Sequence, residues 1–203
     1  MEHLYQAVEQ AGRSGDNIAA TLMSNLGQLL ELQGHYVAAL PLYERALTIR
    51  RYLLGSHHRL TEESLSEVGS CQLEMGNLVA AKPSLEEALL ISETEYGPIH
   101  PNTATSLSNL GRLLQAQGDY AAARPLLERA LAIYEPVLGA THPNTATSLN
   151  NLGWLLQEQG DLEDARPLLA QAVAIYQQRF GVQHPTTRQY QTDLETIDQL
   201  LAE

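Results

Sequence analysis

Side-chain amides recur in this chain at a constant step of 42 residues, a spacing that places them at equivalent points of a repeated element. Asn25, Asn109 and Asn151 fall on one such position, where the remaining repeat has Glu67. A carboxamide offers one acceptor and two donors, so a row of them can pair with the N–H and C=O groups of an extended peptide. The pattern therefore predicts peptide binding rather than bond-making chemistry.

The predicted binding set extends this row to neighbouring positions of the same repeats. It comprises Asn25, Gln28, Glu63, Glu67, Asn109, Arg112, Gln115, Asn150, Asn151, Trp154 and Gln157. Trp154 is the only tryptophan, and tryptophan and arginine often dominate binding interfaces. We expect basic ligand residues near Glu63 and Glu67, and an apolar or acidic group near Arg112 and Trp154. Two structural roles stay open: Trp154 filling space against the next helix, and the asparagines bonding a neighbouring loop.

Other candidates for chemistry have a structural interpretation. One histidine recurs per repeat, at His58, His100, His142 and His184. Metal ligands must converge on one ion, whereas this step spreads the histidines along an edge, so we expect no metal and instead a helix-capping role. Cys71 is the only cysteine, and we expect a buried, inert thiol. Phosphate-binding and nucleophile motifs are missing from the sequence, so we expect no cofactor and no enzyme activity.

Each 42-residue unit must supply two helices to position these side chains. In the third unit, apolar residues at helical spacing predict a first helix over Pro101–Gln117, which Gly118 ends. Asp119 is the predicted N-cap of a second helix, and Gly139 ends that helix. The two-residue turn between them favours an antiparallel hairpin.

Glycines inside the predicted first helices need a physical reason. A glycine costs about 1 kcal/mol relative to alanine inside a helix, yet Gly27, Gly69, Gly111 and Gly153 recur at one position. We expect close helix–helix approach there. The matching small residues on the second helix are predicted to be the two alanine series that begin at Ala39 and Ala46.

The repeat predicts an all-α fold, a right-handed superhelical solenoid of antiparallel helix hairpins, in which each unit buries its apolar face against its neighbours. We expect one repeat domain over 1–203. Its predicted parts are a partial second helix at 1–15, repeats at 16–57, 58–99, 100–141 and 142–183, and a capping helix at 184–203.

Composition narrows the function classes. The net charge is −12 and the sequence has no basic stripe, which argues against nucleic acid and anionic membranes as partners. No apolar run approaches the roughly 18 residues of a membrane span. The first residues lack the pattern of a signal peptide, and a lone cysteine fits a reducing compartment. We expect a soluble, cytoplasmic protein.

The pattern resembles the tetratricopeptide repeat family. The resemblance rests on the Leu-Gly pair of the first helix, the small residues of the second, and the junction Gly-x-x-His-Pro-Asn-Thr-Ala-Thr-Ser-Leu at Gly97–Leu107 and Gly139–Leu149. The 42-residue step is similar to the kinesin light chain variety of this repeat. The resemblance implies a concave groove lined by the first helix of each hairpin, and the assignment of the amides, Arg112 and Trp154 to a binding surface follows from this implied groove.

These observations together predict a non-catalytic scaffold that binds an extended peptide or a partner helix in its groove. One alternative is a homotypic assembly module that self-associates through its terminal helices. Another is the interaction domain of a larger multidomain signalling protein or enzyme.

Overall fold

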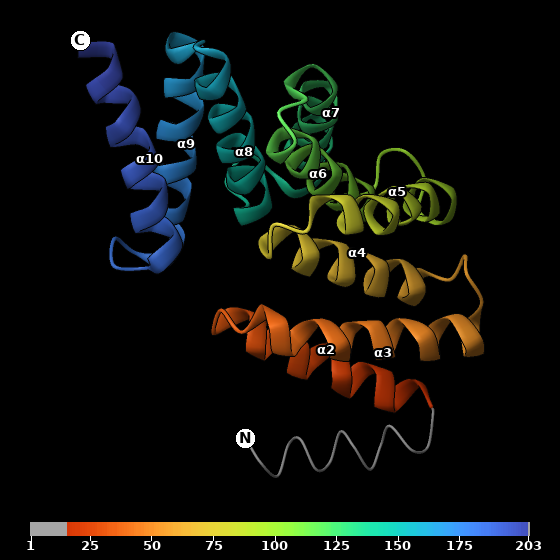
Figure 1. Cartoon of the computed structure of the whole chain (residues 1–203). Helices are drawn as coiled ribbons and strands as arrows, with labels where there is room; N and C mark the ends of the chain where they lie inside the picture. The colour runs from red at the N-terminus through yellow and green to blue at the C-terminus, as the bar shows by residue number, and fades with distance from the viewer. Residues whose placement is uncertain (1–15, 203) are drawn as a thin grey trace. The chain divides into compact units, whose positions relative to one another are not determined.

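The computed structural model describes residues 16–202, within which nine helices and no strand are found (Figure 1). They are α2 (Asn17–Leu32), α3 (Tyr36–Leu54), α4 (Arg59–Glu74), α5 (Leu78–Glu95), α6 (Pro101–Ala116), α7 (Tyr120–Leu138), α8 (Pro143–Gln159), α9 (Leu162–Phe180) and α10 (Pro185–Ala202). The predicted all-α class is therefore confirmed for this part of the chain. The partial helix predicted over 1–15 lies outside the described residues. Between residues 16 and 202, no helix combines the length and the apolar character that crossing a membrane requires.

The helices group into two compact units, Met1–Pro98 and Ile99–Glu203. In the first unit α2 packs on α3, α3 on α4, and α4 on α5. In the second unit each helix from α6 to α10 packs on the next, as Figure 1 shows. Each unit therefore contains complete helix hairpins. The single domain and its repeat boundaries stay a prediction.

The hairpin of α6 and α7 has the predicted ends. Helix α6 begins at Pro101 and ends at Ala116, one residue before the predicted limit. Gly118 has a φ of +78°, a left-handed conformation in which a Cβ would be strained, so it turns the chain without cost. The Asp119 carboxylate then accepts a hydrogen bond from the Ala122 N–H at 3.1 Å and caps α7.

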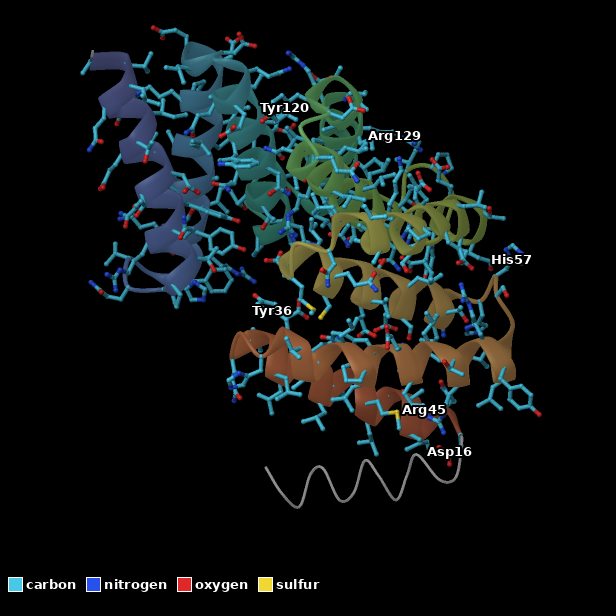
Figure 2. The ribbon with its side chains drawn as sticks, viewed as in Figure 1. Asp16, Tyr36, Arg45, His57, Tyr120 and Arg129 are labelled. Carbon is cyan, nitrogen blue, oxygen red and sulfur yellow. The ribbon has the colours of Figure 1, made fainter. Side chains whose placement is uncertain are left out.

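The recurrent histidines cap α4, α6, α8 and α10, as predicted. The Nδ1 of His142 accepts a hydrogen bond from the Asn144 N–H at 3.1 Å, and His58 and His100 make the equivalent bond at the same length. His184 does so at 3.3 Å at the start of α10. His57, the neighbour of His58, lies exposed on the loop before α4 (Figure 2). The histidine step thus has a structural cause.

The mid-helix glycines lie under a large side chain of the following helix. A Cβ on Gly111 would come within 2.7 Å of Leu127 Cδ2, and one on Gly153 within 2.9 Å of the same atom of Leu169. The predicted close approach is confirmed. Its side-chain partner is the residue four positions after the alanine, however, and the alanine contributes its carbonyl, 3.6 Å away for Ala123. The alanines equivalent to Ala39 therefore lie at the contact, as predicted, and a larger side chain also covers the glycine because a helical side chain covers the turn that precedes its own Cα.

We predict that Gly111→Ala lowers the free energy of unfolding by about 1–2 kcal/mol, since overpacking against Leu127 outweighs the helix propensity of alanine. Urea denaturation followed by circular dichroism measures the change. In a Leu127→Ala background the same substitution should become neutral or stabilising, because the clashing atoms are gone. An equal cost in both backgrounds would contradict the contact.

Candidate functional site

A cavity of about 160 Å³ in the second unit gathers three predicted binding residues, Asn109, Arg112 and Asn151. Its walls come from α6, α7 and α8. The lining residues are Thr105, Ser108, Asn109, Arg112, Tyr134, Asn144, Thr147, Ser148 and Asn151. All nine carry a polar group, and none of them is acidic. Most of the surface that these residues expose to the cavity is nevertheless apolar, so their polar groups form the smaller part of its wall.

Several hydrogen-bonding groups of this lining have no partner within the protein. The Oγ atoms of Ser108 and Ser148 are buried without a hydrogen bond, although the two residues are only 7% and 2% exposed. The Nδ2 of Asn151 is also buried without a hydrogen-bond partner. A buried polar group without a partner costs about 1–3 kcal/mol, so the three groups leave a hydrogen-bonding demand unmet beside the cavity.

Helix α7 contributes Tyr134 to the cavity wall, and the hydroxyl of this tyrosine is hydrogen-bonded. The Tyr134 hydroxyl lies 2.6 Å from the Thr105 Oγ1 across the hairpin. Burial raises the pKa of the Tyr134 phenol, so this side chain stays neutral. Tyr134 thus supplies a fixed, uncharged wall beside the amides.

In the first unit, the exposed Gln28 contacts Glu67, which is largely buried. The Gln28 Nε2 donates to Glu67 Oε1 at 3.0 Å, and the Ser24 hydroxyl donates to Glu67 Oε2 at 2.8 Å. The guanidinium of Arg50, a residue only 2% exposed, lies 3.9 Å from Glu67 and 3.8 Å from Glu63. The carboxylate that was expected to face basic ligand residues is therefore already paired.

The environment of Glu67 changes its titration. The pKa of Glu67 is raised to about 7, because burial, helped by the nearby charge of Glu63, outweighs Ser24, Arg50 and Gln28, which favour the ionised form and lower the pKa. Burial has the larger effect because water that would stabilise the charge is excluded. Glu63 is about half exposed, so it is the freer carboxylate of this region.

The remaining predicted residues are dispersed. Gln115 is only 4% exposed, with an unpartnered Nε2, so it lies in the packing and not on an open face. Asn150 Oδ1 and Gln157 Oε1 are also buried without a partner. Trp154 on α8 is 40% exposed, and Asn25 on α2 is exposed. Trp154 therefore presents a large apolar surface to solvent.

Sequence reasoning missed residues that contribute most of the cavity wall, among them Tyr134, Asn144 and Ser148. It also missed Arg50, which donates to the Ser64 hydroxyl at 2.8 Å. The available signal was the 42-residue step itself, because Arg50 and Tyr134 occupy the same position two repeats apart. Both residues lie on the second helix of a hairpin, and the 42-residue step applied to that helix identifies them.

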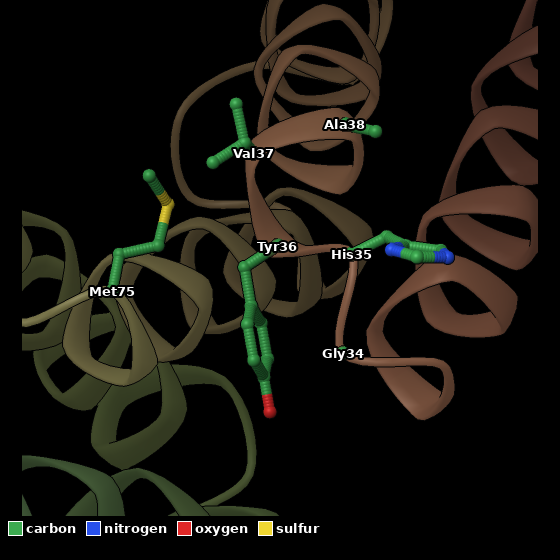
Figure 3. A pocket seen from close by; sticks show the side chains of 6 residues that line it. All are labelled: Gly34, His35, Tyr36, Val37, Ala38 and Met75. Atoms are coloured by element: carbon green, nitrogen blue, oxygen red, sulfur yellow. The ribbon is translucent and has the colours of Figure 1, made fainter.

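A larger cavity of about 550 Å³ lies in the first unit, at the turn between α2 and α3 and the end of α4 (Figure 3). Gly34, His35, Tyr36, Val37, Ala38 and Met75 line it. This lining is mainly apolar and includes none of the predicted binding residues. Over residues 16–202, moreover, no cluster of three or more histidine, cysteine or acidic side chains could hold a metal ion.

Comparison with known sequences identifies one family. The profile described as tetratricopeptide repeat matches residues 2–51, 60–135 and 113–178, which is most of the chain. Among curated proteins, no sequence matches significantly.

Solved structures show the same fold. BtubC from P. vanneervenii is 23% identical with a TM-score of 0.78, over 99% of this chain and 82% of that one. A Podosopora anserina protein of nearly identical TPR-like repeats, named for kinesin light chain, is 27% identical with a TM-score of 0.71 (91% and 87% covered). A Rap protein complexed with Competence and Sporulation Factor is 17% identical with a TM-score of 0.77, covering 90% of this chain and 49% of that one.

We predict a pH-dependent stability that originates at Glu67. Its folded-state pKa of about 7 lies above the usual value of 4.5, so the folded protein retains a proton that the unfolded chain releases. Stability from this group is therefore complete below pH 4.5 and is lost as the pH rises towards 7, with a slope of at most about 1.4 kcal/mol per pH unit. Urea denaturation at several pH values should show this fall for the wild type relative to Glu67→Gln.

The control for this experiment is Glu128→Gln, an exposed carboxylate of the second unit that pairs with Arg124. The stability difference between wild type and this variant should not change over the same pH range as it does for Glu67→Gln. If the difference between wild type and Glu67→Gln were independent of pH, the buried site would not bind a proton as described.

Proposed function

The chain belongs to the tetratricopeptide repeat family, and we propose that it is a non-catalytic interaction module of the cytoplasm that holds an extended peptide or a partner helix. Repeats of this family generally mediate protein–protein interaction and typically form scaffolds without catalytic activity. The binding surface in this proposal is formed by the first helix of each hairpin. Its centre in the second unit is the cavity between α6 and α8.

The observation that carries the proposal is the set of unpartnered groups in this cavity. Ser108, Ser148 and Asn151 each present a buried hydrogen-bonding atom without a protein partner. A peptide supplies hydrogen-bonding groups along its whole backbone, and in this proposal it satisfies such atoms.

Trp154 provides the apolar part of the proposed surface. Its side chain lies on α8, the same helix as Asn151, and is 40% exposed. An exposed aromatic ring on a rigid helix loses little entropy when a partner covers it, and such rings carry a large share of binding energy. One neighbour of the same fold, the Rap protein, was solved with a bound factor, which supports a binding role for this architecture.

The charge preference of the ligand depends on which acidic side chains of the surface already have partners within the protein. Glu67 is engaged by Arg50, Ser24 and Gln28, so the attraction for basic ligand residues in the first unit falls mainly to Glu63. A salt bridge to an exposed carboxylate contributes little, at most about 1 kcal/mol. The amides and Trp154 should therefore contribute more to affinity than the acidic residues.

We predict that the triple variant Asn109→Ala, Arg112→Glu, Trp154→Ala loses partners that wild type retains in an affinity pulldown from native lysate. The substitutions remove two neutral contacts and reverse one charge on the proposed surface, and their combined loss should exceed about 2 kcal/mol. Matching circular dichroism spectra ensures that both proteins are folded.

The matched control carries Gln171→Ala, Gln177→Ala and Arg179→Glu, which are exposed residues on α9. This control should retain the partners. If the control lost them and the first variant did not, the interface would lie on the second helices of the hairpins. If neither lost them, the proposed surface would be wrong.

A further inference from the structure

The turns inside the two hairpins of the first unit carry large apolar side chains that solvent can reach. Leu32 ends α2, Val37 lies at the start of α3, and Val79 lies at the equivalent point of α5. Their exposed fractions are 86%, 78% and 86%. We call these three residues and the adjoining cavity of about 550 Å³ the turn edge.

The cavity gives the turn edge depth. Val37 and Met75 line it from neighbouring hairpins, and Tyr36 contributes an aromatic side chain (Figure 3). A Cβ added to Gly34 would meet nothing within 4 Å, so the space beside this turn is open. Ligand pockets typically enclose about 300–1,000 Å³ and have mainly apolar walls, as this cavity does. The cavity can therefore take a large apolar side chain of a partner.

The fold does not need these apolar side chains, because the second unit is built without them. Helices α6 to α9 begin 84 residues after α2 to α5, so the positions correspond one to one. An exposed apolar cluster that the fold does not require is typical of a contact surface. The second-unit residues that correspond to Leu32, Val37, Met75 and Val79 are Ala116, Ala121, Gln159 and Glu163.

Positive side chains are missing from the sequence on both sides of these turns. Residues 28–44 and 60–81 contain no lysine or arginine, and they contain several glutamates. Glu31, in the last turn of α2, accepts a hydrogen bond from the Tyr43 hydroxyl at 2.7 Å. A neutral donor of this kind does not cancel the negative charge of the carboxylate. The turn edge is therefore acidic as well as apolar.

The titration of a buried thiol reports this negative field. Cys71 lies behind the cavity wall, where its Sγ donates to the Tyr36 carbonyl oxygen at 3.5 Å. Burial raises the pKa of this thiol to about 11, helped by the charges of Glu31, Glu44 and Glu74. The carboxylates thus act at the wall of the cavity, and a positive group of a partner would be attracted there.

A second copy of the chain does not suit this surface. A stable contact between two folded proteins takes roughly 20–30 residues a side, far more than the turn edge offers. In a twofold dimer the surface would also face itself and bring the Glu31 carboxylates of both copies together. A short segment with positive charge meets neither difficulty.

We propose that the turn edge is a second interaction surface, which takes a short partner segment with one aromatic anchor flanked by lysine or arginine. The aromatic ring enters the cavity beside Met75, because thioether sulfur makes favourable contacts with aromatic rings. The flanking cations lie in the field of Glu31. The inference goes beyond the proposed function, since none of these residues belongs to the binding set described above.

Three blocked pentapeptides test the proposal. Ac-Ala-Lys-Trp-Lys-Ala-NH₂ has the anchor and the basic flanks, Ac-Ala-Glu-Trp-Glu-Ala-NH₂ reverses the flanking charge, and Ac-Ala-Lys-Ala-Lys-Ala-NH₂ lacks the anchor. Each is titrated into ¹⁵N-labelled protein while the backbone amide signals of Gly34, Val37 and Val79 are followed. We expect the first peptide to bind about tenfold more tightly than either of the others. Equal affinities overturn the proposal.

A variant locates the bound peptide. Leu32→Ala, Val37→Ala, Val79→Ala should fold, because the three side chains are exposed and the second unit has alanine at two of these points. It should weaken the Lys-Trp-Lys peptide about tenfold or more. The control Tyr52→Ala, Leu90→Ala removes other exposed apolar side chains of the same unit and should leave the affinity unchanged. Unchanged binding by the first variant, or an equal loss in the control, overturns the proposal.

Glu31→Gln tests the charge preference and keeps an oxygen that can accept from the Tyr43 hydroxyl. It should reduce the preference for lysine over glutamate flanks from about tenfold to about threefold, in keeping with the modest strength of exposed ion pairs. An undiminished preference would contradict the role of Glu31 and overturn the proposed basic flank.

Sedimentation at several protein concentrations tests the other occupant. A dimer that the triple alanine variant abolishes would assign the turn edge to a second copy and overturn the proposal. These failures are distinct from failure of the proposed function, because the pulldown variant described above changes only Asn109, Arg112 and Trp154. That variant should bind the Lys-Trp-Lys peptide as the wild type does.

Discussion

The close approach of the two helices in each hairpin is the constraint on which the rest of the structure depends. Gly27 lies under Tyr43, and Gly69, Gly111 and Gly153 lie under Leu85, Leu127 and Leu169. A Cβ at any of these glycines would push the second helix away. Because the contact recurs within both units, positions related by the 42-residue step are equivalent in geometry. Side-chain type can then change from repeat to repeat while the backbone stays the same.

This equivalence lets one site of the fold carry three kinds of chemistry. In the first unit it holds the buried Arg50 with Glu67, an arrangement that needs its additional hydrogen bonds because two desolvated charges seldom recover their hydration alone. In the last hairpin, tyrosines fill it with apolar surface and keep their hydroxyls bonded. Between α6 and α8 it stays open, and each residue that lines it carries a polar group. The proposed binding site is therefore the one of these three that the protein's own side chains leave unfilled.

Much of the local structure followed from single residues. Pro101, Asp119 and Gly118 mark the ends of α6 and α7 as predicted, because each acts on the backbone within one turn. The histidine caps are confirmed for the same reason, and the thiol of Cys71 is buried, as predicted, by packing against α2 and α3. The resemblance to the tetratricopeptide repeat family is confirmed as well. The partner of the mid-helix glycines was predicted less well, since it depends on side-chain direction in a second helix.

The sequence by itself determined the helices, their ends and the row of amides, since periodicity, caps and turns act over a few residues. Only the tertiary structure decided which of those amides meet. It brought Asn109, Arg112 and Asn151 to one cavity, paired Gln28 with Glu67, and buried Gln115. The physical reason is that these contacts join neighbouring hairpins, and each depends on the residue that the second helix inserts between them. Arg50 and Tyr134 occupy one position in the repeat. Arg50 and Glu67 fill the site in the first unit. Tyr134 and Asn151 leave the equivalent site in the second unit open.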